Sequence, residues 1–277
     1  MSERAFILLL LLSFFALLIP LGFIATNGDL DGEQNESEIA AKEDSEELQQ
    51  QHTCKQVPAS DLCTETQHQR FLEMCDLFAA FVEAARHVQL RYTLSDGTLL
   101  GYVRSGGIIS HDQDLDVITF QDYYEAALPN MKAYNELENS YKWTLHPQWR
   151  LKPKDLLAQA GEDPASHRTR KEVGFMAPNA RFGKRQGHGG LHVDVFPLFE
   201  SSSDPDVLER FARTANWRLQ SLPRSSMLPP IACTFIGLPT LCPPNPLPYL
   251  LGAFGISWNI SEKICENGTW IRNPILG

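Results

Sequence analysis

Two aspartates one residue apart have a spacing that suggests metal chemistry. Asp114 and Asp116 flank Leu115, the first residue of a predicted strand, residues 115–120. Side chains two residues apart on a strand point to the same face, and two adjacent carboxylates repel each other unless a cation lies between them. Hard oxygen ligands of this kind suit Mg²⁺ or Mn²⁺, which also bind substrate phosphates. A solvated strand end is the alternative explanation, so the surrounding sequence has to decide.

A glycine and a threonine upstream supply a feature suited to phosphate binding. Gly97 and Thr98 lie between a short predicted strand, residues 91–94, and a short predicted helix, residues 98–104. Free backbone N–H groups at such a junction are able to bind a phosphate. The segment therefore predicts a strand, a Gly-Thr turn, a helix, and then a strand with paired acids.

A third carboxylate occurs where a charge is costly. Asp194 lies in the apolar run of residues 192–199, a predicted central strand, and an unpaired charge there would be unfavourable. Asp194 is therefore either a salt-bridged acid of the core or part of the same site. The basic stretch before it, residues 167–188, includes Arg181 and would bind a pyrophosphate or another anionic group. A solvated basic loop is the alternative.

The order of these features resembles the core of the nucleotidyltransferase superfamily, and one branch of it, the LicD family with fukutin-related protein, is similar in detail. The LicD signature is matched by residues 96–101, Arg104, Ile109 and residues 112–116. Residues 192–199 resemble the family's His-Val-Asp stretch, and a looser similarity extends to Asn273. The sequence departs from the family at Ser110 and His111, where Pro-Trp is usual.

The resemblance implies an enzyme. LicD-type proteins move a phospho-alcohol group, such as phosphocholine or ribitol phosphate, from a CDP-linked donor to a glycan hydroxyl and release CMP. The partners would be a CDP-linked alcohol and a glycan or glycoprotein acceptor. Two alternatives stay open at this point: a nucleotidyltransferase proper, which would need the same metal residues, and a non-catalytic scaffold of the secretory pathway with the same fold.

Roles for individual residues follow from the same resemblance. The metal ligands for Mg²⁺ or Mn²⁺ would be Asp114, Asp116 and Asp194, with Asp112 or Asp194 as the acceptor of the hydroxyl proton. The substrate-binding residues would be Gly97, Thr98, Arg104, His192 and Arg181, with Arg104 as a phosphate clamp.

These residues must be positioned by an alternation of helices and strands, which predicts an α/β class with a mixed, α+β-type sheet. Apolar residues recurring every three or four positions predict a long helix. The predicted helices cover residues 65–88, 98–104, 122–137 and 204–219; the predicted strands cover residues 91–94, 115–120, 141–145, 173–176 and 192–199. After Leu222 proline is frequent, so a further helix is expected only near residues 247–254.

The N-terminus predicts a membrane anchor. Residues 5–25 contain no charge, and roughly 20 apolar residues span a bilayer core as a helix. Arg4 before the run favours a cytosolic N-terminus. We therefore expect residues 1–26 to be a cytosolic tip and signal anchor, 27–52 an acidic disordered stem, and 53–277 a lumenal catalytic domain of a type II protein, in the Golgi. A cleaved signal peptide, which would make the protein secreted, is the alternative.

Cysteines and sequons agree with a secretory location. Of the six cysteines, Cys54 and Cys63, and likewise Cys233 and Cys242, lie close enough in sequence for local disulfides, although sequence does not choose among the possible pairings. Cys75, on an apolar helix face, suits a buried free thiol at least as well as a bridge. Sequons predict glycosylation, and they occur at Asn35, Asn259 and Asn267.

The net charge of -10 is concentrated in one segment and identifies no partner. Residues 27–52 hold nine acids against one base, and the chain from Thr53 on is close to neutral. Because no long basic run occurs, nucleic acid is not expected as a partner.

Overall fold

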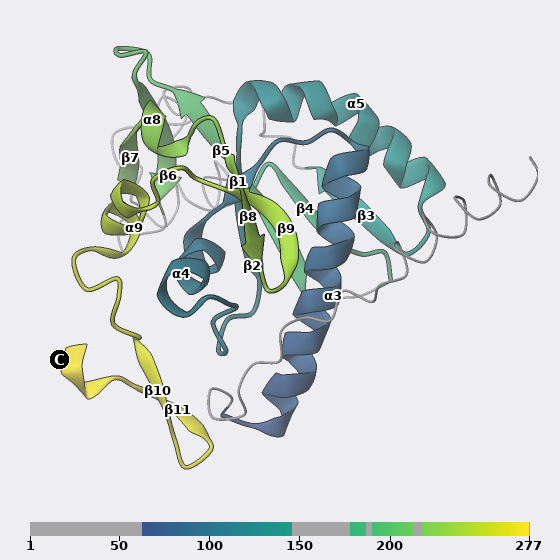
Figure 1. The fold of residues 1–277 in the computed structure, drawn as a ribbon. Helices are drawn as coiled ribbons and strands as arrows, with labels where there is room; N and C mark the ends of the chain where they lie inside the picture. The colour runs from purple at the N-terminus through teal and green to yellow at the C-terminus, as the bar shows by residue number, and fades with distance from the viewer. Residues whose placement is uncertain (1–62, 146–177, 187–189, 213–217, 277) are drawn as a thin grey trace, which may run out of the picture. The chain divides into compact units, whose positions relative to one another are not determined.

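The computed structural model describes residues 63–145, 178–186, 190–212 and 218–276 (Figure 1). The predicted anchor, the acidic stem, the predicted strand 173–176, Asn35 and the first part of the basic stretch lie outside these ranges. Within them, no helix is long and apolar enough to cross a bilayer.

A mixed seven-stranded sheet forms the centre of the described domain. Strands β2 and β5 are parallel, and every other pair in the sheet is antiparallel. The order is β1-β2-β5-β4-β3, with β6 paired to β5 and β7 paired to β6. The bounds are β1 Thr93–Leu94, β2 Leu115–Phe120, β3 Tyr141–Leu145, β4 Ala180–Lys184, β5 His192–Glu200, β6 Val207–Ala212 and β7 Arg218–Pro223. The predicted mixed α/β class is confirmed in this form.

Two long helices, α3 (Glu65–His87) and α5 (Gln121–Leu137), pack against the same side of the sheet. Phe182 of β4 contacts Phe81 of α3 at 5.9 Å and Tyr134 of α5 at 6.3 Å between ring centroids. The 3.6-residue apolar period predicted both helices to within one residue, since it reflects this buried face. Side chains alternate along a strand. Every second residue of β2 and β5 therefore points away from the face that α3 and α5 cover.

The short helix α4 (Asp96–Ser105) follows β1 and ends as the sequence predicts. Gly106 caps it with a positive φ of 72°, a conformation that glycine adopts without steric cost. The helix therefore begins at the Gly-Thr turn and returns the chain to the start of β2, which brings the turn beside the paired acids.

The predicted helix over residues 204–219 is wrong, because this segment forms the hairpin strands β6 and β7. The apolar residues there recur at helical spacing, but β5 offers β6 an edge to pair with. Leu208 and Arg210, two residues apart, are both buried, which is the period of a strand. Tertiary pairing therefore overrode the local pattern.

The C-terminal third contains more regular structure than the prolines suggested. The helix α9 (Leu247–Phe254) is confirmed, and the short helices α8 (Arg224–Met227) and η3 (Pro274–Leu276) were not predicted. Two hairpins were also missed: β8 (Ile231–Phe235) with β9 (Leu238–Cys242), and β10 (Lys263–Glu266) with β11 (Thr269–Arg272). Asn267 and Gly268, both at positive φ, connect the latter, as an Asn-Gly hairpin turn does.

The disulfides only partly follow the sequence prediction. Cys233 pairs with Cys242 as expected, but Cys63 pairs with Cys265 rather than with its neighbour in sequence. Cys75 is disulfide-bonded, which decides for a bridge over the free thiol. The fold brings distant cysteines together, which spacing alone cannot reveal. Structural disulfides indicate an oxidising compartment, that of the secretory pathway.

Candidate active site

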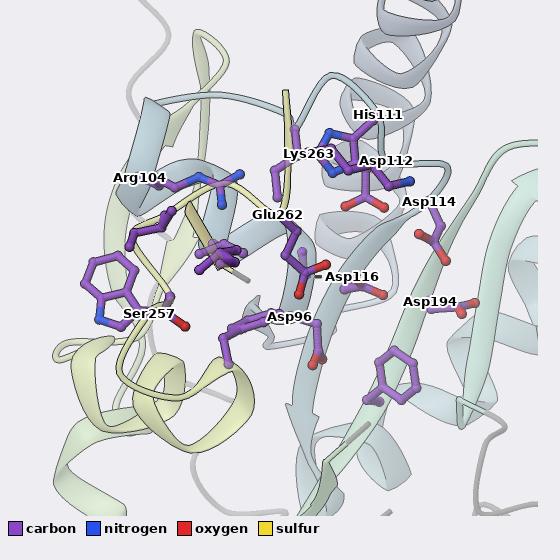
Figure 2. A pocket seen from close by; sticks show the side chains of 18 of the residues that line it. Asp96, Arg104, His111, Asp112, Asp114, Asp116, Asp194, Ser257, Glu262 and Lys263 are labelled. Atoms are coloured by element: carbon purple, nitrogen blue, oxygen red, sulfur yellow. Dashed lines mark hydrogen bonds between the residues drawn. The ribbon is translucent and has the colours of Figure 1, made fainter. Parts of the chain in front are cut away.

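The parallel pairing of β2 with β5 places two of the predicted carboxylates side by side. Asp116 is in register with Asp194, and both are buried on the sheet face away from α3 and α5. Asp114 precedes β2 and faces the same cavity, as Figure 2 shows. Three acids that are up to 80 positions apart in sequence (194 − 114) therefore meet at one place.

The Gly-Thr turn is bonded directly to this cluster. The Gly97 N–H donates to Asp116 Oδ2 at 3.2 Å, and the Asp116 N–H donates to the Thr98 hydroxyl at 2.7 Å. A Cβ on Gly97 would lie 2.3 Å from Asp112 Oδ2, so only glycine lets that carboxylate approach the turn. Thr98 is buried and positions the Asp116 backbone; its contact with a substrate stays a prediction.

The pKa of Asp116 is raised well above its ordinary value. Burial is the main cause, and Asp96, Asp114, Asp112 and Asp194 raise it further. Five carboxylates thus crowd one side of the cavity, where a divalent cation would relieve their repulsion. This crowding of hard oxygen ligands fits Mg²⁺ or Mn²⁺.

Asp194 is already neutralised by the protein. Arg181, which is opposite it on β4, donates from Nε to Asp194 Oδ1 at 2.7 Å, and His192 Nε2 lies 3.4 Å from the same oxygen. Burial alone would raise the Asp194 pKa, but the bonds from His192 and Arg181 outweigh it and hold the pKa below its ordinary value. The Asp194 partnership raises the His192 pKa in turn. Asp194 is therefore both a salt-bridged acid and a member of the site.

One group of described residues is arranged so that it could hold a metal ion. Ligand atoms of Asp114, His192 and Asp194 all lie within 4.8 Å of one another. Two of the three predicted ligands, Asp114 and Asp194, belong to this group. Asp116 is in register with Asp194 of this group, and its role as a metal ligand stays a prediction.

A cluster that the sequence did not suggest holds the turn in place. Arg210 of β6 is buried and bonds Asp96 Oδ1 at 2.8 Å, while the Tyr249 hydroxyl donates to Asp96 Oδ2 at 2.8 Å. The Arg210 guanidinium also lies over the Tyr249 ring, 4.6 Å from its centroid. Asp96 has a positive φ of 42°, a strained conformation for a residue with a side chain. No sequence signal pointed to Arg210, because its segment was predicted as a helix.

The cavity containing these carboxylates measures about 740 Å³ and is closed on one side by the C-terminal segment, residues 255–276. Trp258, Ile260, Glu262 and Lys263 line it opposite the acids. Figure 2 shows Glu262 and Lys263 across from Asp112 and Asp114. These lining residues could not be predicted from the sequence, since prolines and short hairpins carry no motif.

Arg104 and His111 lie where this segment meets α4. Burial lowers the pKa of Arg104, with Glu262 and then Asp112 acting in the opposite direction. Burial also lowers the His111 pKa, and Lys263 and Arg104 lower it further. The His111 ring packs against Trp270 of β11 at 5.0 Å between centroids. Arg104 is therefore a cation inside the cavity, as a phosphate clamp requires, and His111 is packed rather than free in a loop.

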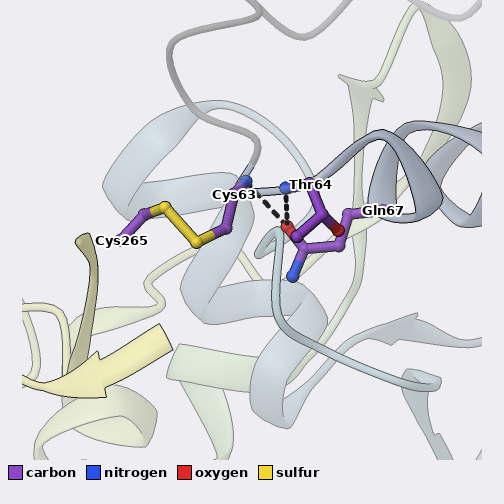
Figure 3. The surroundings of a disulfide bond; sticks show 4 residues. All are labelled: Cys63, Thr64, Gln67 and Cys265. Carbon is purple, nitrogen blue, oxygen red and sulfur yellow. Dashed lines mark hydrogen bonds between the residues drawn. A yellow bond between two sulfur atoms is a disulfide. The ribbon is translucent and has the colours of Figure 1, made fainter. Parts of the chain in front are cut away.

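A disulfide ties the C-terminal segment to the start of α3 (Figure 3). Cys265 of β10 bonds Cys63, whose backbone N–H donates to Gln67 Oε1 at 2.7 Å. The Thr64 N–H donates to the same oxygen, so the side chain of Gln67 caps the helix beside the disulfide. The boundary of the cavity is thus covalently fixed to the helix that packs on the sheet.

The predicted glycosylation sites within the described ranges are exposed. Asn259 lies between α9 and β10, and Asn267 lies at the tip of the β10–β11 hairpin. Both are accessible to a glycan, and their occupancy stays a prediction.

A mixed sheet with carboxylates in register beside a Gly-Thr turn defines a nucleotidyltransferase-type domain. The chain belongs to the LicD/FKTN/FKRP nucleotidyltransferase domain family, which matches residues 89–245, more than half of its length. This confirms the resemblance found in the sequence and implies a transferase that handles phosphocholine or phospho-sugar groups. A comparison with curated proteins found no match. The match contains every predicted metal ligand and Arg210, whereas Tyr249 and the C-terminal segment lie beyond it.

Proposed function

We propose that this protein is a metal-dependent phosphotransferase that moves a phospho-alcohol group from a CDP-linked donor to a glycan hydroxyl. The observation that carries the proposal is the register of Asp116 with Asp194, with Asp114 beside them in a cavity of about 740 Å³. That volume lies within the range of about 300–1,000 Å³ typical of ligand sites. Family membership supports the reaction class, and the donor alcohol and acceptor belong to the proposal.

Asp114, Asp116 and Asp194 would hold Mg²⁺ or Mn²⁺, which when bound neutralises the donor phosphates. Arg104 lines the same cavity and binds a donor phosphate, which orients the diphosphate. Asp112 is the better proton acceptor of the two candidates, because Asp194 has a depressed pKa and is engaged by Arg181 and His192. A weaker base takes the hydroxyl proton less readily.

The transfer exchanges one bond at phosphorus for another. The acceptor oxygen forms a bond to the phosphorus of the phospho-alcohol, and the bond from that phosphorus to the bridging oxygen breaks. CMP leaves with the electron pair, and the hydroxyl proton passes to the Asp112 carboxylate. Positioning and charge neutralisation supply most of the rate, as in other phosphoryl transfers.

The disulfides support a place in the secretory pathway. We further propose a type II membrane protein of the Golgi, anchored by residues 5–25, with the catalytic domain in the lumen. Glycan acceptors occur in this compartment, which is consistent with the proposed reaction.

The test is CMP release by the purified full chain with Mn²⁺ or Mg²⁺, glycan acceptors, and CDP-choline, CDP-ribitol or CDP-glycerol. Metal-dependent release should be lost in Asp114→Asn and kept in Asp122→Asn, an exposed acid on α5. A product that retains cytidine would favour a nucleotidyltransferase proper. Absence of turnover with every donor would favour a non-catalytic scaffold.

A further inference from the structure

The polar face of the sheet continues beyond the carboxylates toward a group of cations. Asp194 on β5 is in register with Arg181 on β4, and Arg181 with Thr144 on β3. In the next row, His192 is opposite Gly183, and Gly183 is opposite Lys142. The face that holds the acids at β2 and β5 therefore becomes basic at β4 and β3.

A second cavity, of about 440 Å³, is lined by this basic part of the face, by Lys184, and by Glu73 and Leu77 of α3. Its cationic lining residues are Lys142, Lys184 and Arg181, and Glu73 is the one carboxylate among the described residues that line it. Arg181 and His192 are shared with the neighbouring site, since Arg181 lines both cavities and His192 contacts Asp194. The two cavities thus meet at Arg181.

The cations of this cavity differ in how they are used. Arg181 is paired with Asp194. Neither Lys142 nor Lys184 forms an ion pair within the described part of the chain, so their ammonium groups remain able to bind an anionic oxygen group. The position of these lysines, next to the carboxylates but outside the larger cavity, separates them from the donor's phosphates.

Building on the proposed function, we infer that the second cavity binds the acceptor and that the acceptor carries an anionic group, a phosphate or a carboxylate, beside the hydroxyl that is modified. Lys142 and Lys184 bind that group. The acceptor hydroxyl then reaches the carboxylate cavity past Arg181, the residue that lines both cavities. A cavity of this size accommodates one or two sugar units.

The inference is tested with three acceptors of one scaffold: galactose, galactose 6-phosphate and galacturonate. CMP release is measured for the full chain and for Lys142→Ala/Lys184→Ala, with Lys132→Ala as a control, since Lys132 is an exposed lysine on α5 outside both cavities. An anionic acceptor should have at least about a tenfold lower KM than galactose, which corresponds to about 1.4 kcal/mol. The double variant should lose this preference, and Lys142→Arg should retain it. Comparing the KM of galactose 6-phosphate with that of galacturonate shows whether the cavity prefers a phosphate or a carboxylate.

Several results would overturn the inference while leaving the proposed function intact. One is an equal KM for galactose and both anionic acceptors. Another is a double variant whose KM rises for the CDP donor and not for the acceptor, which would assign the cavity to the donor. If no donor is turned over at all, the proposed function fails. Calorimetric titration with galactose 6-phosphate then still tests whether the second cavity binds an anionic sugar. An unchanged affinity in a folded double variant would contradict binding by the two lysines.

Discussion

Asp116 and Asp194 are neighbours in register on parallel strands, but their surroundings shift their pKa values in opposite directions. Asp194 is paired with Arg181 and His192. Asp116 accepts a backbone N–H from Gly97 and faces four other carboxylates that raise its pKa. The protein therefore neutralises one acid of the pair itself and surrounds the other with like charge.

The first prediction concerns the folding cost of that arrangement. In EDTA, Asp116→Asn should raise the melting temperature, because it removes a buried charge from among four other acids while an amide oxygen can still accept the Gly97 bond. About 1 kcal/mol would raise Tm by about 2–4 °C in a domain of this size. Calorimetry checks this, with Asp122→Asn as the matched control. An unchanged or lower Tm would mean that the Asp116 charge is already satisfied.

The second prediction decides whether the His192 imidazole binds the metal directly or only orients the Asp194 carboxylate. If Asp114, Asp116 and Asp194 bind the metal, His192 acts through its contact with Asp194, and residues of that kind cost about 10–100-fold in metal affinity when replaced. Mn²⁺ affinity from electron paramagnetic resonance should fall about tenfold in His192→Gln and further in Asp114→Asn. Equal losses in both variants would instead support the group Asp114, His192 and Asp194 as the ligands.

The sequence predicted the acids and their direct partners Gly97, Arg181 and His192, but not the residues that hold the turn and close the cavity. Asp114, Asp116 and Asp194 could be found because local pattern and the Gly-Thr turn mark them, and their strands have buried faces with a clear period. Arg210 could not be found, since its partner Asp96 is 114 residues away and its own segment has a helical spacing of apolar residues. The same limit applies to Cys63 and Cys265, whose pairing depends on where the fold places the C-terminal segment.

The third prediction tests Arg210 as a residue that positions the turn. Removing one partner of a buried ion pair leaves an uncompensated charge and costs about 3–5 kcal/mol. Arg210→Met and Asp96→Asn should each destabilise the protein by roughly 3 kcal/mol in urea unfolding, and the double variant by less than the sum of the two. Additive effects would show that the two side chains contribute independently, against the 2.8 Å contact between them.

The fourth prediction follows from the lowered pKa of His111. Burial, Lys263 and Arg104 favour its neutral form, and Glu262 acts in the opposite direction. A depressed histidine pKa stabilises the folded state above the unfolded value, about 6.5, and this contribution is lost as pH falls through the folded pKa. An NMR titration should therefore place the His111 pKa below 6.5.

Substitutions that remove a charge from the C-terminal segment show in which direction each neighbour shifts the pKa of His111. Lys263→Gln should raise the pKa of His111, and Glu262→Gln should lower it further. The melting temperature of His111→Gln should fall less than that of the wild type between about pH 8 and about pH 5, each of which is more than one unit from the reference pKa of about 6.5. An unshifted His111 titration would place its ring in solvent, away from Trp270.

The fifth prediction concerns the covalent attachment of the C-terminal segment. Cys63 and Cys265 close a loop with a sequence separation of 202 residues, against 9 for Cys233 and Cys242, and the stabilisation by a disulfide grows with loop length. Cys63→Ser/Cys265→Ser should lose about 3–5 kcal/mol and Cys233→Ser/Cys242→Ser about 2–3 kcal/mol. Because the C-terminal segment lines the cavity proposed to bind the CDP donor, the first variant should also raise the KM for that donor, whereas the second should not. A lower stability with an unchanged donor KM would mean that the segment keeps its place without the disulfide, held by contacts such as that of His111 with Trp270.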